Sequence, residues 1–282
     1  MKRVVTGVVT AALTAALVLY LDPVLFGVAA TLVILVAAAE YSTLVQRIVV
    51  SRTVSWALWL AVGILALADT TANELIDVPL PAGLSGAGTW FAAAAAILAL
   101  ATAVGLASHA DIRDRLLTSA LFAFGALWLG LFLVAAINLH VVEPVLLLWV
   151  LVVVSLGDIG AYYGGRLLGR RQLAPVLSPK KTIAGAVSGL AASCAAGVAV
   201  VLVWRGPEAL GLDVPVVALL CGGAGQAGDL VESMLKRAVQ VKDTGGLLPG
   251  HGGLLDRLDS VLLATPAFYV AIQAGATPSL LP

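Results

Sequence analysis

The feature that most constrains this chain is a series of long apolar runs that charged residues rarely interrupt. Only 11% of its 282 residues are charged, whereas soluble domains carry about 25%. Apolar runs of roughly 20 residues are typical of helices that span a bilayer, while strands of a membrane barrel alternate apolar and polar residues over about ten positions. The runs here do not alternate. We therefore predict an all-α fold, a polytopic bundle embedded in a membrane with about nine transmembrane helices.

The candidate transmembrane segments follow one another with short connections and without an internal repeat. They are Val4–Leu21, Val24–Ala39, Val54–Ala68, Trp90–Ala107, Leu116–Ile137, Val145–Tyr163, Thr182–Trp204, Val216–Arg237 and Asp259–Ala274. We predict one integral membrane domain, with N-terminal helices in residues 1–140 and, in residues 141–282, C-terminal helices that carry the catalytic site. Basic residues before an apolar run also resemble a signal peptide, but no small-residue cleavage site follows Leu21, which favours an uncleaved helix.

Basic residues are concentrated in alternate connections between these segments. Thirteen of the 16 lie in or beside the connections after segments two, four, six and eight. The positive-inside rule places such connections in the cytoplasm. With nine spans the N-terminus then falls outside, in conflict with the basic pair Lys2-Arg3. The alternative is a broken or re-entrant pair of helices around Asp22-Pro23.

Charge that is scarce elsewhere collects near the C-terminal end of the chain. On a helix, Asp229, Glu232, Ser233 and Lys236 would share one face, because they follow one another at i, i+3, i+4 and i+7. Carboxylates at membrane depth are costly and usually face a bundle interior or a wet cavity, where they have a function. The alternative is a buried Glu232–Lys236 pair that fixes the position of the helix.

Two further acids, Asp256 and Asp259, stand three residues apart at the start of the last segment. On a helix they would point the same way, and paired carboxylates suit Mg²⁺, which also takes water and phosphate oxygens. The alternative is that both acids complement the dipole of a helix N-terminus. Alone, this spacing is common and carries little weight.

The residues between these two groups favour phosphate binding. Six of the sixteen residues from Lys242 to Arg257 are glycine or proline, and such a main chain can turn consecutive N–H groups toward an anion. Acids for a metal and bases for phosphate at one place predict a magnesium–polyphosphate site. His251, which lies between glycines, could contact phosphate, donate a proton or cap a turn.

A second polar element precedes the seventh segment. Asp158 is a lone acid in an apolar run, and Ser178-Pro179-Lys180-Lys181-Thr182 follows. We expect a helix to begin there with Ser178 as its cap and Pro179 in its first turn. A helix N-terminus flanked by lysines attracts phosphate, although anchoring of the next helix by positive charge is the alternative.

The chain lacks the motifs by which soluble proteins commonly hold nucleotides. It contains no G-x-x-x-x-G-K-[ST], no G-x-G-x-x-G after a strand, no H-E-x-x-H and no G-x-S-x-G. A nucleotide would therefore need another arrangement. The formal net charge is zero, so charge indicates no nucleic-acid partner, and none is predicted.

The spacing of the C-terminal polar residues resembles that of a known family. Ser233-x-x-Lys236-Arg237, then Lys242-Asp243, then Pro249-Gly250-His251-Gly252-Gly253-x-x-Asp256-Arg257-x-Asp259 is similar to the signature of phosphatidate cytidylyltransferases. Asp158 and Ser178–Thr182 resemble the second motif of that family. The resemblance covers roughly the last 130 residues. One departure is that Ile183 and Ala184 stand where many members carry an aromatic residue and an acid.

The resemblance implies a reaction and a set of site residues. These enzymes condense CTP with phosphatidic acid to give CDP-diacylglycerol and pyrophosphate, they require Mg²⁺, and they are generally homodimers. A second, monovalent cation is left open. The resemblance implies metal binding by Asp229, Asp256 and Asp259 and catalytic roles for Asp229, Asp243, Asp256 and Lys242. It implies substrate binding by Ser178, Lys180, Lys181, Thr182, Ser233, Lys236, Arg237, His251, Gly252, Gly253 and Arg257.

The expected setting is a multi-pass protein of a bacterial inner membrane with its site facing the cytoplasm, in contact with membrane lipid. Two alternatives remain. A CTP-dependent lipid or polyprenol kinase would use the γ-phosphate instead, and the motif favours cytidylyl transfer over it. A transporter would use Asp158, Asp229 and Glu232 as an ion path, but such folds show polar breaks in both halves, whereas polar residues here collect in the C-terminal half.

Overall fold

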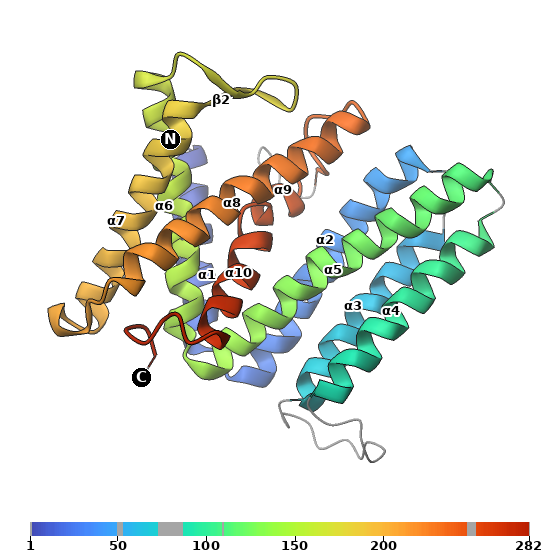
Figure 1. Ribbon diagram of the computed structural model, residues 1–282, viewed down its shortest axis with the longest axis horizontal. Coiled ribbons are helices and arrows are strands. Elements are labelled where there is room, and N and C mark those ends of the chain that lie inside the picture. The colour runs from blue at the N-terminus through green and yellow to red at the C-terminus, as the bar shows by residue number, and fades with distance from the viewer. Residues whose placement is uncertain (1, 50–52, 73–86, 109, 247–251, 282) are drawn as a thin grey trace. The chain divides into compact units, whose positions relative to one another are not determined.

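The structure is a computed structural model that describes residues 2–49, 53–72, 87–108, 110–246 and 252–281 (Figure 1). The chain forms two compact units, each assembled from segments that are distant in sequence. The first unit comprises Met1–Leu21, Asn138–Arg237 and Arg257–Pro282. The second unit comprises Asp22–Ile137 and Ala238–Asp256.

The first unit is almost entirely helical. Its elements are α1 (Lys2–Tyr20), α6 (Pro144–Leu168), β1 (Gln172–Ala174), β2 (Ser178–Thr182), α7 (Ile183–Trp204), the 3₁₀ turn η1 (Pro207–Ala209), α8 (Asp213–Ala238) and α10 (Val261–Gln273). Strands β1 and β2 pair antiparallel. The ring of Trp149 in α6 stacks on Phe268 of α10 with 4.8 Å between centroids, and its Nε1 donates to the carbonyl of Gly197 in α7 at 3.0 Å. One buried indole therefore joins three helices.

The second unit is built on four helices and the segment that follows α8. Its helices are α2 (Pro23–Ile48), α3 (Thr53–Ala72), α4 (Ala87–Ala107) and the greater part of α5 (Ile112–Val142). The four-residue helix α9 (Leu255–Leu258) lies where the chain returns to the first unit. Tyr41 of α2 donates its hydroxyl to the carbonyl of Leu121 in α5 at 2.7 Å, and its ring covers Gly125, where any side chain would collide. Helices α2 and α5 therefore pack closely.

The predicted all-α membrane fold is confirmed. Five of the described helices are long and apolar enough to cross a membrane, judged by length and composition. They are Pro23–Ile48, Ile112–Val142, Pro144–Leu168, Ile183–Trp204 and Asp213–Ala238. The other four predicted segments coincide with α1, α3, α4 and α10, whose apolar parts are shorter among the described residues, so the count of nine stays a prediction.

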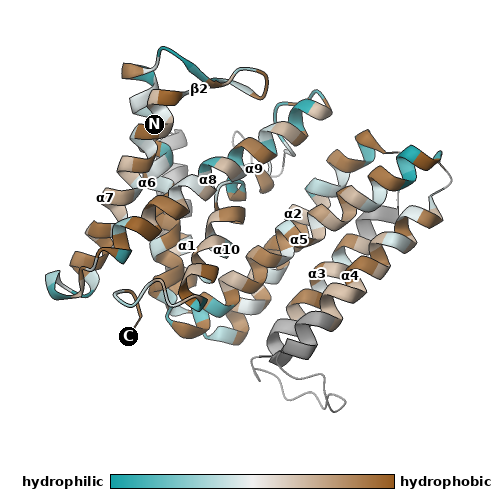
Figure 2. Ribbon diagram, viewed as in Figure 1, coloured by the Kyte–Doolittle hydropathy of each residue, from teal (hydrophilic) through white to brown (hydrophobic). Residues whose placement is uncertain are grey.

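Most helical residues are hydrophobic, whereas hydrophilic residues lie on the β1–β2 hairpin and at helix ends, including that of α8 (Figure 2). The break at Asp22-Pro23 separates two helices, α1 and α2. Asp22 caps α2 by accepting hydrogen bonds from the backbone N–H groups of Val24 and Leu25, both at 3.1 Å, with Pro23 in the first turn.

Small residues bring α6 and α7 together over an extensive contact. A side chain at Gly157 would overlap Ser193, one at Gly160 would overlap Ala192, and one at Gly164 would overlap Ser188. Interfaces in membrane bundles are enriched in such residues because they let backbones approach closely. The close pairing fixes where Asp158 in α6 and the start of α7 lie within the first unit.

We expect Gly160→Ala to lower stability, because its Cβ would overlap Ala192 and lie 3.0 Å from the carbonyl oxygen of Ser188. Overpacking of this kind costs about 1–3 kcal/mol, more than the roughly 1 kcal/mol that alanine gains over glycine in a helix. The measurement is the midpoint of thermal unfolding in detergent. Gly27→Ala is the matched control, since its nearest neighbour is Ile137 Cδ1 at 3.9 Å. Equal midpoints for both variants would contradict the close contact.

Candidate functional site

Helix α8 presents its acids toward the turn that precedes α10. A side chain at Gly228 would collide with the carbonyl oxygen of Asp259, and one at Gly225 would approach the carbonyl oxygen of Ser260 at 3.5 Å. The two glycines, one turn apart, therefore let this turn lie directly on the helix. The next residue of α8, Asp229, is brought beside Asp259 as a result.

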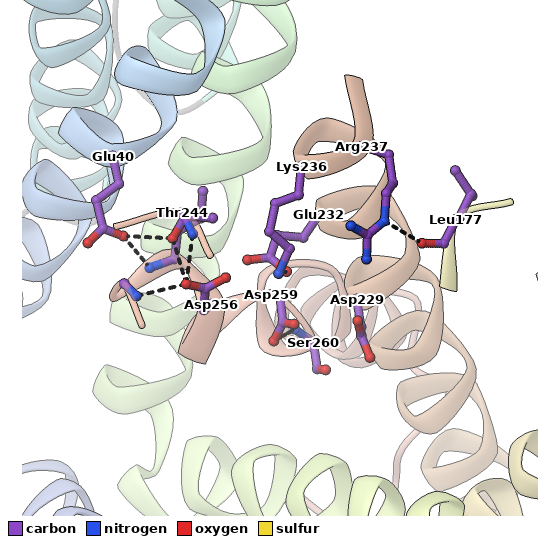
Figure 3. Close-up of polar contacts among 12 residues, drawn as sticks. Glu40, Leu177, Asp229, Glu232, Lys236, Arg237, Thr244, Asp256, Asp259 and Ser260 are labelled. Carbon is purple, nitrogen blue, oxygen red and sulfur yellow. Dashed lines mark hydrogen bonds and ion pairs between the residues drawn. The ribbon is translucent and has the colours of Figure 1, made fainter. Parts of the chain in front are cut away.

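Three carboxyl groups meet at this contact. Oxygen atoms of Asp229, Glu232 and Asp259 all lie within 4.8 Å of one another (Figure 3). Glu232 is fully buried, whereas Asp229 and Asp259 are partly exposed. We call these three residues the acidic cluster. Asp158 of α6 lies near it, because Ser260, which follows Asp259, donates its hydroxyl to the Asp158 carboxylate at 3.3 Å.

Two lysines pair with the acidic cluster. Lys181 of β2 forms an ion pair with Asp229 at 2.5 Å between Nζ and Oδ2, and Lys236 forms one with Glu232 a turn away on α8. The Glu232–Lys236 pair that the sequence left as an alternative is therefore present. It does not stand alone, because the same glutamate also faces two other carboxylates. Each lysine thus neutralises one carboxylate on α8.

The β1–β2 hairpin supplies Lys181 and corrects one expectation. Residues 178–182 form strand β2 rather than the first turn of a helix, so Ser178 is not a helix cap. The cap of α7 is Thr182, whose hydroxyl accepts from the N–H of Gly185 at 3.0 Å. The strand is favoured because its main chain bonds to β1. Arg237 of α8 supports the hairpin by donating to the carbonyl of Leu177 at 3.2 Å (Figure 3).

Electrostatics at the acidic cluster favour a cation. Asp259 lies in the turn between α9 and α10, outside the helices. Burial, and after it the nearby Asp229 carboxylate, raises the pKa of the Asp259 carboxyl above its usual range. A cation among these oxygens would offset both effects and favour the ionised form of Asp259.

The two described ends of the glycine-rich segment contact Asp256 in the second unit. The Oδ2 atom of Asp256 accepts from the backbone N–H of Thr244 at 2.9 Å, from the Thr244 hydroxyl at 3.0 Å and from the N–H of Gly253 at 2.7 Å. Gly252 takes a φ of 79°, which favours glycine, and a side chain there would lie 2.7 Å from the same oxygen. One carboxylate therefore joins Thr244 to Gly253.

The predicted site residues divide between the two units. The acidic cluster brings together Asp229 and Asp259, with Lys181, Lys236 and the buried Ser233 on the elements around it. Ser178, Lys180 and Thr182 lie on β2, and Arg237 lies at the end of α8. The second unit contains Lys242 and Asp243, which are exposed, together with Gly252, Gly253 and Asp256. Arg257 is exposed and is the residue at which the chain re-enters the first unit. His251 lies outside the described residues. The ligand role of Asp256 stays a prediction.

Two residues of this region, Glu40 and Thr244, were not predicted from the sequence. Glu40 of α2 accepts hydrogen bonds from the N–H groups of Leu254 and Leu255 and from the Thr244 hydroxyl (Figure 3). One signal was present in the sequence: Glu40 is a lone acid beside an apolar segment, where a carboxylate is costly. Its partner lies 204 residues away, which no local pattern reveals.

The donor set of the acidic cluster fits a hard divalent cation. Three carboxylates within reach of one point provide the oxygen ligands that Mg²⁺ prefers, and the partial exposure of two of them leaves room for water or phosphate. The two paired lysines could turn toward phosphate oxygens once a cation neutralises the acids. The cluster can therefore hold a metal and a polyphosphate side by side.

Comparisons with known proteins agree with this chemistry. A model of the cytidylyltransferase family matches residues 1–274. A phosphatidate cytidylyltransferase of Brucella abortus biovar 1 is 47% identical over 124 residues, 44% of this chain and 45% of that protein. A phosphatidate cytidylyltransferase of Staphylococcus saprophyticus is 42% identical over 126 residues, which are 45% of this chain and 48% of that protein. One of Bacillus subtilis is 44% identical over 123 residues, which are 42% of this chain and 44% of that protein. The match thus spans somewhat less than half the length of each relative.

Proposed function

This chain belongs to the cytidylyltransferase family, and from that premise we propose that it is a phosphatidate cytidylyltransferase of a bacterial inner membrane. The substrates are CTP and phosphatidic acid, and the products are CDP-diacylglycerol and pyrophosphate. The observation that carries the proposal is the acidic cluster on α8, with Lys181 and Lys236 paired to it. The similarity to proteins of that name supports the choice of lipid.

The reaction needs alignment and charge neutralisation more than proton transfer. An oxygen of the phosphatidate phosphate attacks the α-phosphorus of CTP and forms a new P–O bond. The bond between the α-phosphorus and the oxygen that bridges to the β-phosphorus breaks, and pyrophosphate leaves with that electron pair. Because a phosphate monoester is already an anion, no strong general base is required. Catalysis then rests on orientation and on cations placed where negative charge develops.

The chain's own residues would meet these demands as follows. Lys181 and Lys236 offer ammonium groups that can bind phosphate oxygens, and the partly buried position of Lys236 beside Glu232 strengthens any such interaction. Asp229, Glu232 and Asp259 would hold Mg²⁺, which when bound polarises a phosphoryl oxygen and neutralises a leaving pyrophosphate. The β1–β2 hairpin brings Lys181 to the cluster and is fixed there by Arg237.

The remaining features follow from the same proposal. Substrate-binding roles for Lys180, Lys242, Arg257, Gly252 and Gly253 rest on the family resemblance, as do those of the hydroxyl groups of Ser178, Thr182 and Ser233. The acyl chains of phosphatidic acid would stay in the lipid phase, since the described helices expose mainly apolar side chains. The cytoplasmic orientation rests on the distribution of basic residues. The homodimer, the monovalent cation and the roles of Asp243 and His251 rest on the family resemblance alone.

The proposal is tested by stoichiometry. Purified protein in detergent, supplied with CTP, Mg²⁺ and phosphatidic acid, should release one pyrophosphate for each CDP-diacylglycerol identified by mass spectrometry. Omission of phosphatidic acid should stop pyrophosphate release, and diacylglycerol should not replace it, because it lacks the attacking phosphate. Formation of CDP together with a lipid that has gained one phosphate would instead show a kinase. Release of inorganic phosphate without a lipid product would overturn both.

A further inference from the structure

The carboxylate of Glu40 accepts hydrogen bonds from the two described ends of the glycine-rich segment, for which the sequence predicts phosphate binding. Its Oε1 accepts from the N–H of Leu254 at 3.0 Å, and its Oε2 accepts from the N–H of Leu255 at 2.8 Å and from the Thr244 hydroxyl at 3.2 Å. We propose that Glu40 is a positioning residue that holds Thr244, Leu254 and Leu255 in the positions that binding of CTP requires. This role rests on the function proposed above.

Two glycines, Gly245 and Gly253, leave space for the Glu40 carboxylate. A side chain at Gly253 would lie 2.5 Å from Oε2 of Glu40, and one at Gly245 would lie 2.6 Å from Oε1. Neither glycine has a positive φ, so space and not backbone conformation requires a residue without a side chain at both positions. The main chain therefore closes on Glu40 from two places that lie eight residues apart in sequence.

Glu40 is coupled to Asp256 through one hydroxyl. The Thr244 oxygen lies 3.2 Å from Oε2 of Glu40 and 3.0 Å from Oδ2 of Asp256. A hydroxyl has one hydrogen, so it donates to one carboxylate at a time, and Thr244 bridges the two. Asp256 also holds Gly253. Loss of Glu40 would therefore loosen the two N–H groups at the start of α9 and free Thr244 from its place beside Asp256.

The negative charge of Glu40 matters to this arrangement, because two oxygens receive bonds from three donors. In Glu40→Gln one of these oxygens becomes an NH₂ group, which cannot accept from a backbone N–H. Hydrogen bonds to charged groups are worth more than neutral ones, and a buried donor left without an acceptor is costly. The variant keeps the size of the side chain, so the packing of α2 is unchanged.

The test compares full-length wild type, Glu40→Gln and Glu208→Gln in detergent. Glu208 is exposed in η1 and loses the same charge without touching the segment. In Glu40→Gln we expect the KM for CTP to rise about tenfold while the KM for phosphatidic acid stays unchanged. The midpoint of thermal unfolding should fall, because a donor is left without its acceptor. Hydrogen exchange of the Leu254 and Leu255 amides should become faster.

A second pair of variants keeps the test decisive if Glu40→Gln is unstable. Thr244→Val removes the bridging hydroxyl and should raise the KM for CTP, whereas Thr244→Ser keeps the hydroxyl and should restore it. In the double variant with Glu40→Gln, Thr244→Val should add little, because both changes break the same contact.

The outcomes separate this role from a structural one and from failure of the proposed function. A KM for CTP in Glu40→Gln within twofold of that in Glu208→Gln overturns the proposal. Equal rises of both KM values also overturn it, because they show a general loss of structure. If wild type transfers no cytidylyl group, the proposed function fails, and the exchange measurement then decides separately whether Glu40 holds the segment. Unchanged exchange at Leu254 and Leu255 overturns the anchoring in every case.

Discussion

Replacing Asp259 with asparagine should lower the rate of cytidylyl transfer by at least about 100-fold at saturating CTP and phosphatidic acid. The substitution keeps the shape of the side chain but removes one of the three carboxylates that meet within 4.8 Å. A cation held by the remaining two would bind more weakly and sit less precisely against the phosphates. The measurement is the rate of CDP-diacylglycerol formation as a function of Mg²⁺ concentration.

The control for this variant is Asp111→Asn. Asp111 is exposed and accepts from the N–H of Asp114 at the start of α5, a cap that asparagine also provides. It should retain wild-type activity. A folded Asp259→Asn variant with wild-type turnover and an unchanged Mg²⁺ requirement would remove Asp259 from the metal site.

The second large effect should come from a single methyl group at Gly228. Gly228→Ala would push its Cβ into the carbonyl oxygen of Asp259, which belongs to the main chain and cannot rotate away. The turn that carries Asp259 must then move off α8, and displacement of a catalytic group by about 1 Å can cost roughly 100-fold in rate. We expect a loss of that size in turnover, together with a lower unfolding midpoint.

Gly223→Ala on the same helix is the matched control. Its nearest neighbour beyond its own helix is Leu190 Cδ2 at 4.0 Å, so the new methyl group has room. Alanine is the better helix former by about 1 kcal/mol, so the midpoint should stay the same or rise. Equal activity in the two variants would show that the contact between α8 and Asp259 does not position the site.

The helices could be predicted because the bilayer demands long apolar runs with their backbone bonds satisfied internally. That requirement marks α5, α6, α7 and α8 plainly in the sequence. The hairpin at 172–182 was missed, because β1 is only three residues long and mixed polar residues around Pro179 read equally well as a helix start. Residues 178–182 form a strand because they pair with β1, and local sequence does not reveal pairing between two segments.

In the candidate site, too, contacts within one helix could be predicted from the sequence, whereas contacts between distant segments could not. Helical spacing alone placed Asp229, Glu232 and Lys236 on one face, and the structure confirms that Glu232 and Lys236 pair there. The approach of Asp259 to α8 depends on Gly228 and could not be read from periodicity. The bond between Glu40 and Thr244 spans 204 residues, so only the folded chain reveals it.

The most direct test of the proposed reaction follows the phosphorus atoms of CTP. Protein in detergent, with Mg²⁺ and phosphatidic acid, would receive CTP labelled at the α-phosphate in one tube and at the γ-phosphate in another, and the lipid would be extracted. Cytidylyl transfer predicts lipid that carries only the α-label. Lipid that carries only the γ-label would contradict the account, because the lipid would then have received the terminal phosphate and the protein would act as a kinase.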